Sequence, residues 1–248
     1  MTPGGRRIPL RVAAAVLAVF WGLLFYGLID LLAFLQGPEF HDTVLLSTGW
    51  GLVFLVLVAA PLATVAVASR ATASSAAAEL LAVAAAVAVG ALLSASPRHL
   101  ALTAGLLLSA ALVAWLGHAS PRPIEWHWST APAAALAVAV VPAASYVWTS
   151  ARSTGTGRTT DDTWGFDHWP VQAALPVALL LVAALAAGHP RGWRLPLWTA
   201  TAATIWFAVV AFVEPSLVGS LDRGWSVAVL VWAVGFAVLT TRSAPGDL

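Results

Sequence analysis

The chain has 248 residues, of which 60% are hydrophobic and 9% are charged, whereas about a quarter of the residues in a soluble domain are charged. Its 12 basic residues nearly balance its 11 acidic residues, which argues against a nucleic-acid partner and against a polybasic tail that binds lipid headgroups. Cysteine is absent, which excludes disulfides, thiolate metal ligands and iron–sulfur clusters.

Eight long apolar segments follow one another along the chain. Each is about as long as the ~20 residues that a membrane-spanning helix needs. Polar or Pro/Gly-containing stretches separate them, as in a helical bundle in lipid, where backbone groups pair within their own helix. We therefore predict an all-α, polytopic membrane bundle that forms a single transmembrane domain over residues 1–248. The predicted helices cover residues 10–36, 44–68, 75–95, 99–117, 131–150, 170–188, 195–213 and 224–241.

The arginines predict the orientation of this bundle. With the N-terminus in the cytoplasm, eight of the twelve arginines fall on the cytoplasmic side, as the positive-inside rule requires. The acidic residues separate in the opposite sense, because most of them lie in the outer connections. An even number of spans then places both termini in the cytoplasm, and the plasma membrane is the expected location.

Two acids lie within the predicted helices. Asp30 is about six residues from the outer end of the first segment, and Glu79 is about one turn from the inner end of the third. Ionisable residues in hydrocarbon often mark a proton or cation pathway. The alternative is a snorkelling or locally paired acid, with Arg98 as the partner of Asp30 and Arg70 as the partner of Glu79. Neither acid is at the midplane, which argues against a proton-coupled pump.

Other features of the segments favour helix packing over chemistry. Three segments contain an interior proline, which indicates tolerated kinks more than unwound cation-binding turns: Pro61, Pro142 and Pro176. The third segment has small residues at four-residue spacing, typical of a face for close helix packing: Ala86, Gly90 and Ser94.

Tryptophan positions add to the membrane interpretation. Ten of the 13 tryptophans, Trp50 and Trp169 among them, lie near predicted helix ends, where the amphipathic ring suits the headgroup layer. Trp21, Trp206 and Trp232 fall deeper in the segments, where we expect them to fill the bundle.

Four outer connections bring histidines and carboxylates to one side of the membrane. Two or three histidines with one or two carboxylates suit zinc, copper or non-haem iron. A transition metal bound by His41, Asp167 and His168 is therefore the one cofactor that the pattern suggests, and no other cofactor is predicted. The chain has no HExxH motif, so an acidic, solvated rim is the alternative. The candidate residues are His41, Asp42, His99, Asp161, Asp162, Asp167 and His168.

The stretch TTDDTWGFDHWP, residues 159–170, has a structural interpretation for its second half. Asp167 can cap the helix that follows, Trp169 can anchor it at the interface, and Pro170 fits its first turn. Gly165 lets the chain turn back toward the membrane.

Three classes of function fit these observations. We favour a non-enzymatic transporter or permease for a small solute, because the predicted interior carries almost no charge with which to bind a charged substrate. A scaffold or accessory subunit needs only packing faces and anchors. A membrane enzyme would use the outer histidines and acids as a metal site, although no G-x-S-x-G or P-loop motif is present. The expected partners are the lipid bilayer and either another membrane protein or a second copy of the chain.

Overall fold

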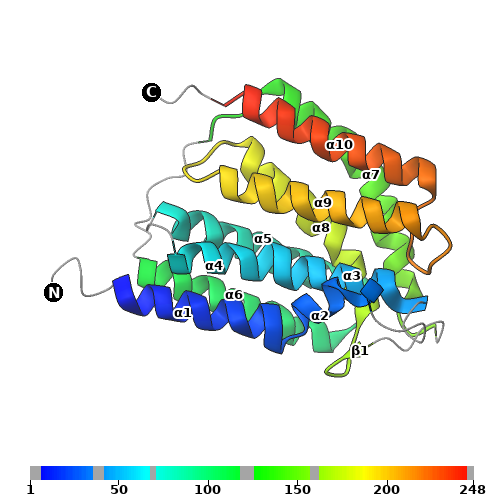
Figure 1. Ribbon diagram of the computed structural model, residues 1–248, viewed down its shortest axis with the longest axis horizontal. Helices are drawn as coiled ribbons and strands as arrows, with labels where there is room; N and C mark the ends of the chain where they lie inside the picture. The colour runs from blue at the N-terminus through cyan, green and yellow to red at the C-terminus, as the bar shows by residue number, and fades with distance from the viewer. Residues whose placement is uncertain (1–6, 36–41, 68–70, 118–125, 157–161, 245–248) are drawn as a thin grey trace.

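The computed structural model describes residues 7–35, 42–67, 71–117, 126–156 and 162–244. These residues form a bundle of helices that run side by side along the long axis of the molecule (Figure 1). Within the described ranges, seven helices are long and apolar enough to cross a membrane. The predicted all-α polytopic bundle is therefore confirmed.

Seven of the eight predicted segments are continuous helices that begin and end within a few residues of the predicted bounds. One of them comprises α3, the π-helix η4 and α4 in an unbroken run. The elements are α3 (Val44–Gly51), η4 (Leu52–Ala59), α4 (Ala60–Val67), α5 (Ala71–Leu93), α6 (Pro97–Gly117), α7 (Thr130–Ser153), α8 (His168–Ala187), α9 (Arg194–Val213) and α10 (Arg223–Arg242).

The first predicted segment is different, and the prediction of one continuous helix over residues 10–36 was wrong. An apolar helix of 17 residues, Ile8–Leu24, is followed by a break and two short turns of helix. Seventeen residues is the lower limit for crossing a bilayer. The elements are α1 (Arg7–Val19), the π-helix η1 (Phe20–Leu24), α2 (Gly27–Leu31) and the 3₁₀-helix η2 (Ala33–Leu35).

Tertiary contacts hold this break in the first segment. Tyr26 has a left-handed backbone with φ 65°, which ends the helix. Gly27 then packs so closely that a Cβ there would lie 2.8 Å from the carbonyl oxygen of Trp21. The indole Nε1 of Trp50 donates a hydrogen bond of 3.1 Å to the carbonyl of Phe25, a residue at the break. The buried backbone therefore has a partner where the helical ladder stops.

A second irregularity precedes Pro61. Proline has no N–H, and its ring clashes with the carbonyl of the residue four positions earlier in an α-helix. The π-helical turns of η4 end at Ala59, directly before the start of α4. Their wider spacing accommodates Pro61 without ending the helix. Pro142 and Pro176 lie inside α7 and α8, which are also continuous.

The helices pack in layers around α5 and α8. α5 contacts both α6 and α8, α8 also contacts α7 and α9, and α10 packs on α9 (Figure 1). At Gly90 of α5 a Cβ would lie well under 3.0 Å from the carbonyl oxygen of Pro170 in α8. The predicted close-packing face of the third segment is therefore confirmed at Gly90.

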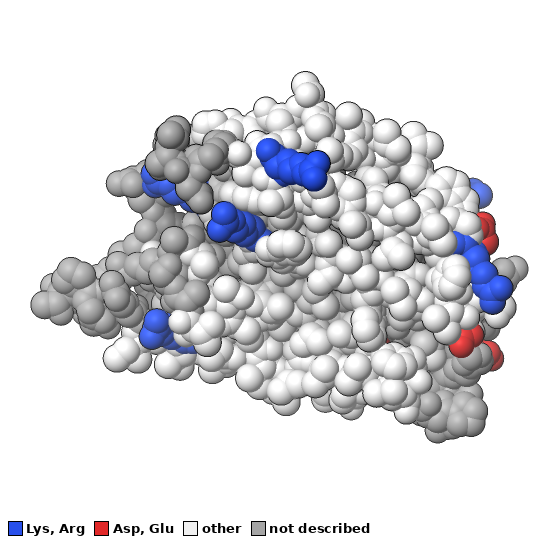
Figure 2. Space-filling model, turned by 45° about the horizontal axis from the view of Figure 1, so that its top comes forward, with Lys and Arg blue, Asp and Glu red and all other residues white. Residues whose placement is uncertain are grey.

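The two ends of the bundle differ in structure and in charge. One end carries the antiparallel strands β1 (Asp162–Thr163) and β2 (Phe166–Asp167), and we call it the hairpin end. The start of α1 and the end of α10 both lie at the opposite end, on opposite sides of the bundle, and we call it the terminal end (Figure 1). On the face shown in Figure 2, the acidic side chains gather at the hairpin end and a broad uncharged band separates it from the terminal end.

Two predicted interfacial tryptophans lie in the interior instead. Trp50 is 0% exposed and Trp169 is 4% exposed, because both rings pack between helices at the hairpin end. Their interfacial assignment was wrong, since position along a helix does not report which face the ring occupies. Trp21 is buried, as predicted for a residue that fills the bundle.

Candidate functional site

Three buried side chains from separate segments form a hydrogen-bonded relay at the hairpin end. Asp30 comes from α2, Thr163 from β1 and His168 from the first turn of α8. The Thr163 hydroxyl donates to Asp30 Oδ2 at 3.1 Å, and the same oxygen lies 2.8 Å from His168 Nε2. With Asp30 ionised, the single hydroxyl proton goes to the carboxylate, so His168 Nε2 donates to Thr163. The relay therefore links the broken first segment to the start of α8.

The aromatic surroundings of the relay position His168. Its ring stacks on Trp50 with centroids 4.7 Å apart and planes 27° apart. Trp50 in turn packs on Phe25 and Phe54. The imidazole thus has an apolar support on its face and a polar partner at its edge, which fixes its orientation.

The β-hairpin places the Thr163 hydroxyl between Asp30 and His168. Trp164 and Gly165 occupy the two central positions of the turn with φ values of 56° and 75°, as in the two-residue turns that join strands tightly. The predicted turn at Gly165 is therefore confirmed. Arg98 Nη1 donates to the Gly165 carbonyl at 3.1 Å and holds the tip of the hairpin against α6.

His99 and Asp167 lie beside the relay, but both ring nitrogens of His99 and one carboxylate oxygen of Asp167 have structural partners. His99 Nε2 donates to the Asp167 carbonyl at 2.8 Å, so Nδ1 accepts from Ser96 at 2.7 Å in the neutral ring. Asp167 Oδ1 accepts from the Trp169 amide at 2.9 Å, which confirms the predicted cap of α8. These contacts assemble the loop and leave no ring nitrogen of His99 free to bind a metal.

The other outer candidates are only partly placed. Asp42 is described and exposed, two residues before α3. His41, Asp161 and the side chain of Asp162 lie outside the described part of the chain. Among the residues that the structure describes, no three His, Asp or Glu side chains are arranged to hold a metal ion. A metal site that includes His41 stays a prediction.

Replacing Thr163 with valine tests the relay. The variant keeps the shape of the side chain and removes the hydroxyl, so Asp30 and His168 each lose one buried hydrogen bond. We expect the free energy of unfolding in detergent to fall by about 1–3 kcal/mol. The matched control is Thr103→Val, because the Thr103 hydroxyl contacts only the His99 carbonyl of its own helix. The control should change stability by no more than about 0.5 kcal/mol, and equal effects of the two variants would contradict the relay.

A second buried acid lies toward the terminal end. Glu79 of α5 is 0% exposed, and its Oε1 hydrogen-bonds to the hydroxyl of Thr199 in α9. One turn earlier on the same face of α5, Ser75 donates to the Gly192 carbonyl at 3.0 Å. Two polar contacts thus hold this part of α5 against the start of α9. The side chain of Glu79 is turned into the bundle, and Arg70, its predicted partner, lies outside the described residues.

The Glu79 carboxyl is incompletely satisfied by the protein. Its Oε2 is buried and has no hydrogen-bond partner among the described residues. An ionised carboxylate in hydrocarbon without a compensating group costs several kcal/mol. Oε2 is therefore open to a proton, a cation, a bound water or a hydrogen-bond donor from a ligand, and buried acids in membrane bundles commonly bind such groups.

A third buried polar group, Gln172, was not predicted from the sequence, because only ionisable residues were taken as candidates within the helices. Gln172 of α8 is 0% exposed and donates to the Tyr146 hydroxyl at 2.6 Å, and that hydroxyl donates to the Gly219 carbonyl. Gly49 of α3 provides the space for the amide oxygen of Gln172, since a Cβ at this position would overlap that oxygen. A polar residue flanked by apolar ones in a predicted span was the available signal.

Comparison of the chain with models of protein families, with curated proteins and with solved structures gave no match.

Proposed function

We propose that this multi-pass membrane protein is a permease for a small solute, and that Glu79 contacts the solute. The observation that carries the proposal is the fully buried Glu79 carboxyl, with Oε1 held by Thr199 and Oε2 without a protein partner in the described chain. A carboxyl with only a structural role is normally satisfied on both oxygens. An unsatisfied acid between two central helices is suited to bind and release a ligand.

The composition of the interior indicates the class of solute. Among the described residues, the buried ionisable side chains are acids and histidines, and no arginine is buried. Such an interior attracts cations and neutral hydrogen-bond donors and disfavours anions. We therefore propose a small cationic or hydrogen-bond-donating solute.

The broken first segment is the second feature that supports transport. Transporters commonly place polar groups beside discontinuous helices, because irregular backbone in a membrane is tolerated where it is enclosed by protein. Here the break at Tyr26 lies four residues before Asp30, whose carboxylate is held by Thr163. The bundle thus has a buried acid toward each end, at a contact between segments.

Flux into proteoliposomes tests this function. The full chain is reconstituted, and entry of glycerol, urea, methylammonium and protons is followed by light scattering and by an internal pH dye. At least one probe should enter faster than into protein-free vesicles. Glu79→Gln should lower that rate at least about tenfold, since losing a hydrogen bond to a charged group costs about 1.5–3 kcal/mol.

Thr199→Val should lower the rate in the same direction, because it removes the partner of Oε1. Thr204→Val is the matched control: Thr204 is also buried on α9, but its hydroxyl contacts the Ala200 carbonyl of its own helix. The control should retain the wild-type rate. Probe entry at the protein-free rate for every solute would overturn the proposal.

A further inference from the structure

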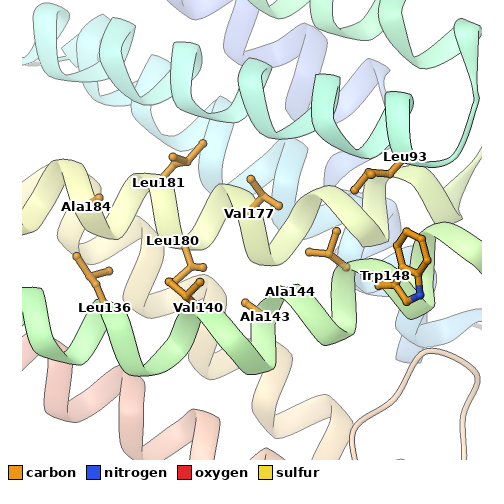
Figure 3. A pocket seen from close by; sticks show the side chains of 11 residues that line it. Leu93, Leu136, Val140, Ala143, Ala144, Trp148, Val177, Leu180, Leu181 and Ala184 are labelled. Carbon is orange, nitrogen blue, oxygen red and sulfur yellow. The ribbon is translucent and has the colours of Figure 1, made fainter.

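An apolar groove lies between α7 and α8, apart from the buried acids. It has a volume of about 490 Å³ and is lined by hydrophobic side chains. Figure 3 shows Leu136, Val140 and Ala143 of α7 facing Leu180 and Val177 of α8. Val140 is 51% exposed, so the groove is open to the surroundings of the bundle.

Small side chains create this groove. Ala143 and Ala144 follow Pro142 in the middle of α7 and present only methyl groups to the gap. On α8, Pro176 directly precedes the lining residue Val177. Both helices therefore have a proline beside the groove, where the backbone ladder of each helix lacks one hydrogen bond.

One end of the groove carries a positive charge. Trp148 lines the groove near the hairpin end, beside Leu93 (Figure 3). The guanidinium of Arg152, one turn further along α7, lies 4.5 Å from the centroid of the Trp148 ring. Arg152 is exposed and lies in the last turn of α7. The apolar groove thus ends near the Arg152 guanidinium, which packs against the Trp148 ring.

We propose that the groove binds one acyl chain of an anionic phospholipid, with the lipid phosphate at Arg152. The distance along α7 from Leu136 to Trp148 is about 18 Å at the helical rise, longer than the ~15 Å depth of one hydrocarbon leaflet, so an extended acyl chain can lie along the groove. Arginine is well suited to a phosphate, because its planar group donates several hydrogen bonds at once.

Native mass spectrometry of the full chain in mild detergent tests this site. The protein is titrated with phosphatidylglycerol and, separately, with phosphatidylcholine that has the same acyl chains. Wild-type protein should bind one phosphatidylglycerol more tightly than phosphatidylcholine. Arg152→Gln should weaken phosphatidylglycerol binding about fivefold, which corresponds to about 1 kcal/mol, and should remove the preference between the two lipids.

The controls separate the groove from general surface charge. Arg223→Gln removes an arginine at the same end of the bundle that lies over Phe212, away from the groove, and should leave lipid binding unchanged. Ala144→Phe fills the groove and should lower binding of both lipids, whereas the exposed Ala134→Phe on the same helix should not. Equal phosphatidylglycerol affinity in wild type, Arg152→Gln and Ala144→Phe would overturn the proposal. So would a groove covered by a second copy of the chain, seen as a dimer that Ala144→Phe dissociates.

Discussion

Replacing Gly90 with alanine is expected to destabilise the bundle by about 3 kcal/mol, the upper part of the range for an overpacked core. The new methyl group would lie well under 3.0 Å from the Pro170 carbonyl oxygen and 3.1 Å from the Ala174 Cβ. Because a backbone atom cannot rotate away, α5 and α8 must separate. Unfolding in a denaturing detergent titration measures the loss.

Gly235→Ala is the matched control for this variant. Gly235 is also inside a helix, α10, but apart from the backbone of its own helix no described heavy atom lies within 4 Å of the position of an added Cβ. Alanine should stabilise α10 by up to about 1 kcal/mol through its higher helix propensity. If Gly90→Ala were as stable as Gly235→Ala, the close contact between α5 and α8 would be refuted.

Replacing Trp50 with alanine has the other large expected effect. The ring is 0% exposed, stacks on His168, and lies with its centroid 4.7 Å from that of Phe54. Its removal leaves a cavity, for which a loss of about 3–5 kcal/mol in the free energy of unfolding is typical. The Phe25 carbonyl at the break in the first segment also loses its 3.1 Å hydrogen bond.

The control for this variant is Trp225→Ala, since the Trp225 side chain is 53% exposed at the same end of the bundle. We expect it to change stability by no more than about 0.5 kcal/mol. Chemical denaturation in detergent, followed by the loss of helical signal, compares the two variants. Similar stability of the two would mean that Trp50 is at the surface, as its position in the sequence suggested.

The helices could be predicted because their signal is local. A run of about 20 apolar residues bounded by proline, glycine or charged residues indicates a membrane-spanning helix, and seven of the predicted segments form such a helix. The cap at Asp167 and the turn at Gly165 were also predictable, since the polar atoms involved are within a few residues. Local chemistry therefore accounts for the elements and their ends.

The break in the first segment could not be predicted in this way. Tyr26 is in an apolar run that predicts a continuous helix, and its left-handed backbone depends on contacts with residues distant in the chain. Trp50 supplies one of these contacts, and the packing of Gly27 beside the backbone of Leu55 supplies another. Such contacts become visible only when two segments are placed side by side.

The candidate sites show the same limit. The sequence identified Asp30 and Glu79 as polar groups of interest, but their partners are far away in the chain. Thr163 is 133 residues from Asp30, and Thr199 is 120 residues from Glu79. Residue type therefore indicated where chemistry can occur, and only the fold showed which groups meet.

We propose that the Glu79 carboxyl works in transport and is more than a packing group. The most direct test is the initial rate of probe entry into proteoliposomes that contain Glu79→Gln, at wild-type protein content and with the unfolding midpoint measured alongside. A rate at or below about one tenth of wild type, with the fold intact, is the predicted result. A wild-type rate in the folded variant would contradict the claim.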